Sequence, residues 1–408
     1  MMNNDKPLAK PIKIGNRIVE NRFVINAMEC CDSDAGGNMT EHSIKRYENL
    51  FHGNAGVIFF ESITLQYENR ARDHQISLQP NNHQNIESLK NFIESMKKIN
   101  NKPLLIFQLN HSGEVSSDEF SERVCVKPFY GYQGRLLEEE EIEKIMDDFV
   151  LASKILHDIG ADGVDLKFCH GYLGSQILRP YNDRQWKYGG PWQNRSRFAF
   201  ELTERIRKEV SDPNFVIGSK VSMWEAIPGG CGTAGPDTAT MDLSESITLC
   251  KGLEERGANF ILESAGNAVL STRIVQPPRT FPEAAYLHFG FTKMLKEILR
   301  PETVVIGSAY SVFGDGNNML NGAKPRELSL IYLGNKNIEK GYTDMVALGR
   351  QSLADPLLPA KYLEGRENDI NWCKACDLCV VLLSNMAEVA CGIFDEGARA
   401  NLKKIQKK

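Results

Sequence analysis

Eight short, continuous apolar segments, separated by longer amphipathic stretches, restrict the possible folds of this chain more than any other feature. The predicted strands are Arg22–Met28, Gly56–Ile63, Pro103–Asn110, Gly163–Cys169, Val216–Ser222, Phe260–Ala265, Thr303–Ala309 and Met345–Arg350. Continuous rather than alternating apolar runs are typical of strands that are covered on both faces. The clearest helices between them are predicted over Asn85–Ile99, Glu139–Ile159, Arg197–Val210, Leu243–Arg256 and Ala284–Leu299.

Eight strands that alternate with helices predict an α/β fold, namely a (β/α)8 TIM barrel. A doubly wound parallel sheet is the alternative. No Gly-x-Gly-x-x-Gly sequence directly follows a predicted strand, which argues against a Rossmann dinucleotide-binding unit. We expect residues 1–355 to form the barrel and residues 356–408 to form a short cysteine-rich extension.

The composition excludes several classes of partner. The chain has 408 residues, 42% of them hydrophobic, and a formal net charge of −5, which argues against a nucleic acid or an anionic membrane as the main partner. No segment approaches the run of about 18 apolar residues that a membrane span needs, and the N-terminus has no apolar signal core. We therefore expect a cytoplasmic protein, whose ten cysteines serve as thiols or metal ligands.

Four cysteines near the C-terminus stand close enough in sequence to bind one metal centre. Cys373, Cys376, Cys379 and Cys391 have the spacing C-x2-C-x2-C-x11-C. Four thiolates at such spacings hold [4Fe–4S] clusters. Zinc also binds four cysteines, but usually from two separate C-x2-C pairs. The spacing alone favours an iron–sulfur cluster. A zinc site, a disulfide bond and a chance grouping of cysteines remain as alternatives.

The fourth predicted strand ends in a group of residues suited to chemistry. Lys167 lies near its end, and His170 and Tyr172 follow. Active sites of TIM barrels form at the C-terminal ends of the strands. A cation, an imidazole and a phenol at this place can bind a carbonyl group and supply a proton. The alternative is a buried, hydrogen-bonded histidine beside a surface lysine.

The ends of the last two strands are candidates for binding a phosphate. Barrels often bind phosphate at the loops after strands seven and eight, where Ser308, Ala309, Gly349 and Arg350 lie. Small residues let the backbone approach a phosphate, and arginine can bind one with two hydrogen bonds. Taken alone, either segment is more typical of an ordinary loop.

Several motifs between Ile12 and Cys391 carry a family resemblance. They are NRFVINAM at 21–28, QLNHSG at 108–113, GADGVD at 160–165, HGYL at 170–173, QIL at 176–178, PYNDR at 180–184, YGG at 188–190, NRSRF at 194–198 and LGRQSLADP at 348–356. Together they resemble the old yellow enzyme family of FMN-dependent oxidoreductases. With the cysteine tail, the chain is similar to the branch that contains 2,4-dienoyl-CoA reductase and trimethylamine dehydrogenase, in which a [4Fe–4S] cluster follows the barrel.

The resemblance implies a role for each matched position. Ala27 and Met28 would flank the flavin, Gln108 would bind its pyrimidine edge, and Lys220 would stand near N1 and O2, where a positive charge stabilises the reduced flavin. The resemblance implies phosphate contacts from Ser308, Ala309, Gly349 and Arg350, cluster ligation by Cys373, Cys376, Cys379 and Cys391, and catalytic roles for Lys167, His170 and Tyr172. Tyr172 matches the proton donor, and His170 matches the second of two residues that anchor a substrate carbonyl or carboxylate.

Two departures from the family pattern affect the expected chemistry. Lys167 stands where relatives have histidine or asparagine, and a lysine can only donate hydrogen bonds. Glu29 stands where relatives often have a residue that tunes the flavin. An unpaired carboxylate there would oppose formation of the anionic flavin.

The expected function is reduction of an activated C=C bond of an enone or enoate, with electrons relayed through the cluster to FMN. The alternatives are an amine or C–H dehydrogenase or demethylase that runs the relay in the oxidative direction, and a non-catalytic flavoprotein or zinc-bearing barrel. Besides the small-molecule substrate, we expect an external electron donor, which is NADH, ferredoxin or a separate reductase. The similar enzymes continue into nucleotide-binding domains, which we expect to be absent here or on another polypeptide. Formation of a homo-oligomer is compatible with the sequence.

Overall fold

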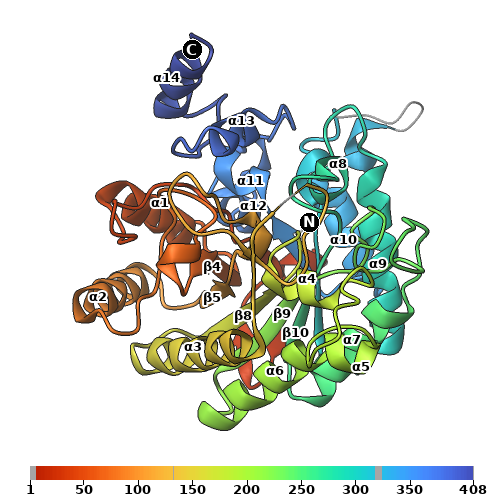
Figure 1. Cartoon of the computed structure of the whole chain (residues 1–408). Coiled ribbons are helices and arrows are strands. Elements are labelled where there is room, and N and C mark those ends of the chain that lie inside the picture. Colours follow the sequence, from red (N-terminus) through yellow and green to blue (C-terminus); the bar gives the residue numbers. More distant parts are fainter. Residues whose placement is uncertain (1–5, 132, 318–323, 408) are drawn as a thin grey trace.

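The computed structural model describes residues 6–131, 133–317 and 324–407. Eight parallel strands form a closed barrel in which each strand pairs with the next and the last with the first (Figure 1). The barrel strands are β3 (Phe23–Ile25), β4 (Val57–Thr64), β5 (Leu104–Asn110), β8 (Gly163–Phe168), β9 (Val216–Ser222), β10 (Phe260–Ser264), β11 (Val304–Gly307) and β12 (Met345–Leu348). The predicted TIM barrel is therefore confirmed.

Helices cover the outside of the barrel, and the five predicted helices are among them. The helices before the tail are α1 (Glu41–His52), α2 (His83–Ile99), α3 (Glu139–Asp158), α4 (Leu173–Leu178), α5 (Trp192–Arg195), α6 (Arg197–Glu209), α7 (Ser244–Glu255), α8 (Thr272–Val275), α9 (Ala284–Ile298) and α10 (Leu330–Glu339). Two short ladders lie outside the barrel, β1 (Ile12–Ile14) with β2 (Arg17–Val19) and β6 (Val124–Cys125) with β7 (Arg135–Leu136). Gly160 and Gly257 follow α3 and α7 with φ of +95° and +89°, a backbone conformation that suits a helix end.

Three predicted strands end two or three residues earlier than expected, at Ile25, Gly307 and Leu348 in place of Met28, Ala309 and Arg350. The local backbone explains the last two. β11 stops at Gly307 because Ala309 has a left-handed backbone with φ of +68°. β12 stops at Leu348, and Arg350 is the first residue of helix α11 (Arg350–Ala354) rather than the end of a strand. Both changes shorten the barrel strands, so that Ser308, Ala309 and Gly349 lie in the connections after them and Arg350 begins α11.

The alternation of side chains along the strands places a polar layer above an apolar one inside the barrel. Val24, Ile106, Leu262 and Ile306 belong to the inner apolar cluster, which the β1–β2 hairpin extends with Ile14 and Val19. Residues two positions further along a strand point to the same side. The residues at these positions are Asn26, Gln108, Ser264 and Ser308, so polar side chains collect at the C-terminal mouth of the barrel.

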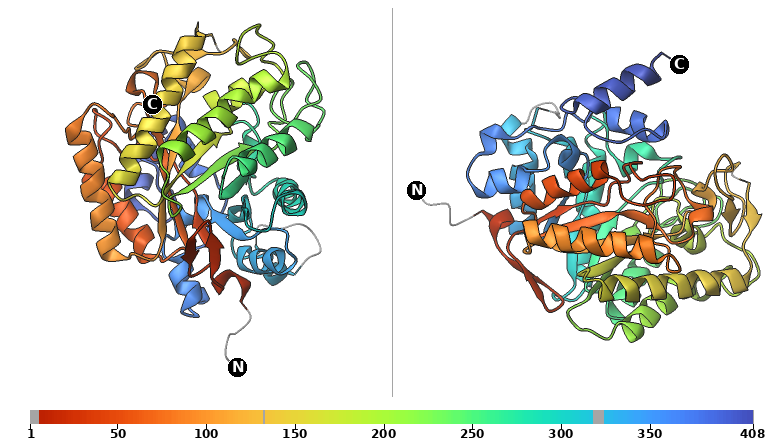
Figure 2. Two further views of the ribbon diagram at one scale, coloured as in Figure 1. Left: turned by 90° about the horizontal axis from the view of Figure 1, so that it is seen from below. Right: turned by 90° about the vertical axis from the view of Figure 1, so that its left-hand side faces the viewer.

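The tail after β12 lies against the loop that follows β3. It contains α11, α12 (Leu358–Leu363), α13 (Leu378–Ser384) and α14 (Glu396–Ile405), and α14 projects at the C-terminal end (Figures 1 and 2). Cys30 packs into an apolar cluster with Leu382, Val389 and Leu402, and the Val389 amide donates a hydrogen bond of 2.8 Å to the Cys30 carbonyl. The tail thus joins the barrel near its mouth, although the predicted boundary at residue 355 stays a prediction.

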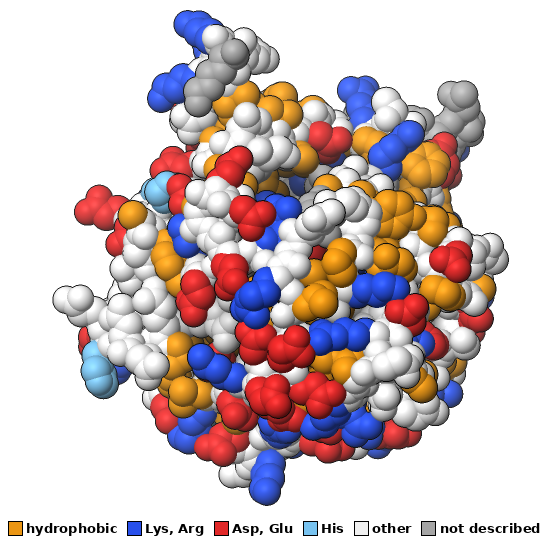
Figure 3. Space-filling model, viewed as in Figure 1, with side chains coloured by type: hydrophobic (Ala, Val, Ile, Leu, Met, Phe, Trp, Pro, Cys, Tyr) orange, Lys and Arg blue, Asp and Glu red, His pale blue; other side chains and the backbone are white. Residues whose placement is uncertain are grey.

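The described surface carries mixed charges. Figure 3 shows acidic and basic side chains interspersed on the face in view, with apolar side chains around the C-terminal segment. Among the described residues, no helix combines the length and apolar character that crossing a lipid bilayer requires.

Candidate active site

Lys167 and Tyr172, two of the three predicted catalytic residues, lie against each other at the barrel mouth. The Lys167 ammonium stands 3.3 Å from the centre of the Tyr172 ring, close enough for a cation–π interaction. Both side chains are buried. Strand β8 presents Lys167, and Tyr172 immediately precedes helix α4. The structure therefore brings together the predicted cation and the predicted phenol.

Both residues bind the carboxylate of Glu29. The Lys167 ammonium donates to Glu29 Oε1 at 3.0 Å and to the Ser62 hydroxyl at 2.9 Å. The Tyr172 hydroxyl lies 3.0 and 3.1 Å from the two carboxylate oxygens, and Arg72 Nε is 3.7 Å from Oε2. The carboxylate that could have opposed flavin reduction is thus paired with two cations. We call Glu29, Lys167, Arg72, Ser62 and Tyr172 the Glu29 cluster.

The electrostatics of the Glu29 cluster fix its protonation. Burial alone would raise the pKa of Glu29, but Lys167 and Arg72 outweigh it and hold that pKa below its ordinary value. Burial, followed by the neighbouring Glu29 charge, raises the pKa of Tyr172 well above its ordinary value. In the structure as it stands, the tyrosine is a neutral phenol that donates its proton toward a carboxylate.

His170 makes a separate set of contacts at the same mouth. Its Nε2 lies 2.6 Å from the Ser264 hydroxyl, and its backbone amide donates to the Ser222 hydroxyl at 3.2 Å. Burial, with added repulsion from Lys220 and Lys167, lowers the pKa of His170 well below its ordinary value. The imidazole is therefore neutral and hydrogen-bonded. The alternative interpretation of the sequence placed a surface lysine beside this histidine, but Lys167 is buried.

Gln108 and Lys220 meet at a buried carboxylate that the sequence analysis did not single out. Gln108 Nε2 donates to Asp165 Oδ2 at 2.6 Å. Burial raises the pKa of Asp165 to about 6, against the opposing effects of Gln108 and Lys220, and burial lowers the pKa of Lys220. The signal that could have found Asp165 is its position two residues before Lys167 on the same strand.

The barrel mouth contains buried polar atoms that a bound cofactor could satisfy. Among the described residues, Asp165 Oδ1, Asn26 Oδ1 and both side-chain polar atoms of Asn110 have no hydrogen-bond partner. Buried polar atoms are normally paired, so such a group needs an explanation. A flavin presents a row of donors and acceptors along its pyrimidine ring, and these residues beside Gln108 and Lys220 fit it.

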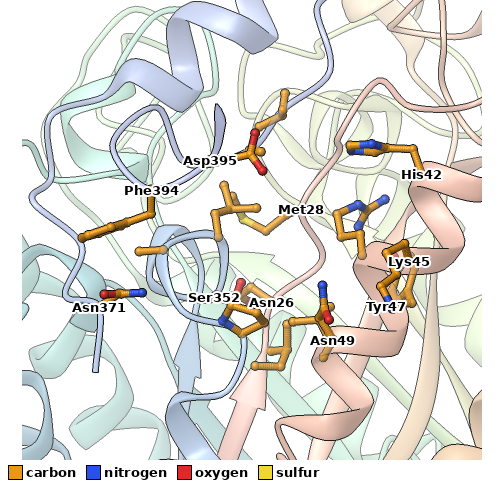
Figure 4. A pocket seen from close by; sticks show the side chains of 18 of the residues that line it. Asn26, Met28, His42, Lys45, Tyr47, Asn49, Ser352, Asn371, Phe394 and Asp395 are labelled. Atoms are coloured by element: carbon orange, nitrogen blue, oxygen red, sulfur yellow. The ribbon is translucent and has the colours of Figure 1, made fainter. Parts of the chain in front are cut away.

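Residues predicted to flank the flavin and its phosphate are neighbours. A Cβ atom on Gly349 would lie 3.6 Å from the sulfur of Met28. Met28 and Asn26 also line a cavity of about 360 Å³ between α1 and the tail (Figure 4). Ala27 packs against the inner apolar cluster. None of the Glu29 cluster lines this cavity, so it adjoins the mouth without containing the catalytic candidates.

The structure gives two of the predicted phosphate ligands other partners. The Ser308 hydroxyl donates to the Glu263 carbonyl at 2.7 Å. The Arg350 guanidinium donates to the Asp377 carboxylate and, at 2.6 Å, to the Pro277 carbonyl. Asp377 lies between Cys376 and Cys379, so Arg350 reaches from the end of the barrel into the cysteine segment. Its predicted phosphate contact stays a prediction.

The four tail cysteines share one region. Cys373 interacts electrostatically with Cys376 and Cys391, and Cys379 with Cys373 and Cys376. The Ala375 amide donates to the Cys373 sulfur at 3.4 Å, and Cys376 is exposed. Within the described residues, no three His, Cys, Asp or Glu side chains are grouped so that they could hold a metal ion. The donor set of four thiols is that of a [4Fe–4S] cluster, in which each thiolate binds a different iron atom.

Comparison with known proteins decides the family. A profile described as the NADH:flavin oxidoreductase / NADH oxidase family matches residues 7–261. The chain belongs to this family. The predicted relationship to old yellow enzymes is thereby confirmed, and the chain is an oxidoreductase of a flavin-dependent family.

The relatives of this family member include both reductases and amine dehydrogenases. The chain is 27% identical over 412 residues to the cinnamate reductase of Clostridium sporogenes, covering 96% of this chain and 58% of that protein. It is 26% identical over 383 residues to the N,N-dimethylglycine/sarcosine dehydrogenase of Chromohalobacter salexigens, covering 91% and 50%. The structure of a 2-naphthoyl-CoA reductase complex matches with a TM-score of 0.77 at 22% identity, covering 97% and 58%. The chain thus spans about half the length of these proteins.

Proposed function

We propose that the protein reduces an activated C=C bond next to a carbonyl or carboxylate group, with FMN at the barrel mouth and a [4Fe–4S] cluster in the tail. The observation that carries the proposal is the contact of the Lys167 ammonium with the Tyr172 ring, at the barrel mouth that also holds Gln108, Asp165 and Lys220. FMN, when bound and reduced, supplies the hydride that the β-carbon accepts.

The protein's own side chains supply orientation and the proton. Lys167 polarises the substrate oxygen, and His170, which is neutral and bonded to Ser264, offers a second contact to it. Donors aimed at the charge that develops on this oxygen contribute about 3 kcal/mol each in enzymes of this kind. Tyr172 gives its phenolic proton to the α-carbon.

The cysteine tail would relay electrons to the flavin. Cys373, Cys376, Cys379 and Cys391 would hold the cluster, and the exposed Cys376 marks the side that an external donor can reach. The donor is NADH, ferredoxin or a separate reductase. This assignment is supported by the C-x2-C-x2-C-x11-C spacing of the four cysteines and by the electrostatic interactions among their thiols.

The oxidative alternative is favoured by one comparison, because a relative is named a dehydrogenase of N,N-dimethylglycine and sarcosine. A cationic amine substrate needs aromatic side chains around it, and Trp224 and Tyr181 are the candidates for this role. Lys127 already stands 4.0 Å over the Tyr181 ring, and the Trp224 indole donates to the Ala239 carbonyl. Together with Lys167 in the mouth, these contacts favour the reductive direction.

An anaerobic experiment tests the proposal. The purified protein should show flavin absorption with a broad iron–sulfur shoulder, and iron and sulfide analysis should give about four of each per chain. The dithionite-reduced protein is then mixed with a panel of enones and enoates that includes cinnamate, and the oxidised protein is mixed with sarcosine as the oxidative control. Flavin reoxidation by an unsaturated compound supports ene-reduction. Reoxidation by none of the panel, or flavin reduction of the oxidised protein by sarcosine, contradicts it.

A further inference from the structure

The Glu29 carboxylate occupies the donors that the proposed reaction needs for its substrate. Lys167 and Tyr172 are the two side chains meant to bind and protonate the substrate, yet both point to Glu29 at 3.0 Å. Arg72 adds a second cation at 3.7 Å. The arrangement of two cations and a phenol around one carboxylate is a complete binding site for a carboxylate, filled here by a side chain of the protein itself.

The position of Glu29 in the chain allows it to leave. It lies on residues 26–32, which belong to neither helix nor strand, whereas Lys167 belongs to a central barrel strand. Displacing Glu29 therefore breaks side-chain contacts without breaking the barrel. Lys167 stays in place for whatever anion arrives.

We infer that Glu29 is an internal counter-anion which a substrate carboxylate displaces, so that the site selects unsaturated carboxylates and takes up one proton, on Glu29, when they bind. This inference rests on the proposed function and names its substrate class. A second carboxylate at Lys167 and Arg72 leaves two like charges in one buried site, and one of them must then be protonated. Glu29 is the one that has lost its partners.

The proton taken up on binding has a use in the reaction. Tyr172 loses its O–H bond as the new C–H bond forms at the α-carbon, and the phenolate then takes the proton held on Glu29. Glu29 returns to a carboxylate that again binds Lys167, which helps the saturated product leave. The overall reaction thus consumes one proton from solvent and one hydride from the reduced flavin.

The groups that face Glu29 make it the titrating member of the cluster. Lys167 approaches from β8, Tyr172 from the turn before α4, and Arg72 from the loop after β4. Cys31, its neighbour in the same loop, stays a thiol because burial raises its pKa to about 12. Without Lys167, the burial of Glu29 is left as the main influence on its pKa, and burial raises it.

Binding of a saturated carboxylate to the oxidised holoprotein tests this inference without turnover. The probe is hydrocinnamate, with acetate and benzoate as smaller carboxylates and hydrocinnamide as the uncharged analogue. Calorimetry in two buffers of different ionisation enthalpy measures the protons taken up per ligand. We expect uptake of about one proton per bound carboxylate and of none per bound amide. The Kd of the carboxylate should increase about tenfold for each unit that the pH is raised, over the range in which binding requires protonation of Glu29.

The variant Glu29→Gln should remove both effects. We expect hydrocinnamate to bind about 10- to 100-fold more tightly, since an unpaired Lys167 gains a charge-assisted hydrogen bond, with no proton uptake and no change for hydrocinnamide. Glu143→Gln is the matched control. Glu143 also binds a lysine, a tyrosine and an arginine, namely Lys187, Tyr188 and Arg205, but outside the barrel, on α3, on α6 and on the loop before α5. This variant should behave as the wild type.

Several outcomes would overturn the inference. They are unchanged or weaker carboxylate binding in Glu29→Gln, proton uptake that persists in it, or no binding of any of the three carboxylates to either protein. If Glu29→Gln does not fold, a pH-independent Kd in the wild type is decisive. Failure of the proposed function looks different. Proton-linked binding without flavin reoxidation by any member of the enone and enoate panel refutes ene-reduction alone, whereas reoxidation without proton-linked binding refutes the role of Glu29 alone.

Discussion

Replacing Lys167 by methionine should destabilise the protein far more than an ordinary lysine replacement. The side chains of Lys167 and Glu29 are only 5% and 9% exposed, and their charges are 3.0 Å apart. At an effective dielectric constant of about 20, the attraction at that separation is about 5 kcal/mol before desolvation. Removing one partner of a buried ion pair typically costs about 3–5 kcal/mol, because the other charge stays buried. Arg72 and Tyr172 remain on Glu29, so we expect a loss of about 3 kcal/mol.

Urea unfolding of the FMN-saturated protein near neutral pH measures the loss, followed by both tryptophan fluorescence and circular dichroism. Lys187→Met is the control, since Lys187 pairs with Glu143 while both side chains are about one-third exposed, 36% and 33%, and exposed pairs contribute at most about 1 kcal/mol. The double variant Lys167→Met/Glu29→Gln should recover part of the loss, because it removes the unpaired charge. The loss should also shrink at acidic pH, where the isolated Glu29 becomes protonated. Equal effects of the Lys167 and Lys187 replacements would refute a buried, paired Glu29.

Three further outcomes follow from the structure. Tyr172→Phe keeps the ring beside Lys167 but lacks the proton, so the rate of flavin reoxidation by an accepted substrate should fall about 10²- to 10⁴-fold, and stopped-flow rates within threefold of the wild type would exclude Tyr172 as the donor. Cys376→Ser should lose the iron–sulfur absorption and bound iron while retaining the far-ultraviolet spectrum, whereas full iron content would remove Cys376 from the ligands. Burial lowers the pKa of His111 to about 4 in the folded protein, whereas a histidine of the unfolded chain has a pKa of about 6.5. Between these two pH values the unfolded state binds more protons than the folded state. The free energy of unfolding should therefore fall by about 3 kcal/mol as the pH drops from about 6.5 to about 4. His111→Asn should flatten this pH dependence, and an unchanged slope would contradict it.

The strand and helix pattern could be predicted because it depends on local periodicity. Continuous apolar runs mark strands buried on both faces, and all eight predicted runs contain barrel strands. The strand ends were less predictable. Ala309 ends its strand region with a left-handed backbone, which no side-chain pattern signals, because alanine has no preference for that conformation.

The contacts at the barrel mouth could be predicted only in part. The sequence identified Lys167 and Tyr172 because one lies near the C-terminal end of a strand and the other just beyond it, where barrels place their active sites. The partners of Glu29 lie between 43 and 143 positions away in sequence, so their meeting depends on the closed barrel and not on spacing. Asp165 was within reach of sequence reasoning, since it shares a strand face with Lys167.

Arg350 shows how one residue can link two proposed sites. It stands at the end of β12, where the family pattern implies a phosphate ligand, yet its guanidinium lies on Asp377 in the cysteine segment. The next residue, Gln351, also contacts the start of the cysteine segment. Its side chain donates to the Asn371 carbonyl and accepts from the Cys373 amide, both at 2.9 Å.

Helix α11 therefore holds the cysteine segment directly against the barrel end that is proposed to bind FMN. Its first two residues supply four side-chain hydrogen bonds to residues outside the helix, three of them to the segment that carries the cysteines. A flavin at the mouth and a cluster in the tail would then be fixed relative to each other by one short helix rather than by a mobile linker. Electron transfer between two such centres needs a constant separation, and the hydrogen bonds of α11 are what would keep it constant.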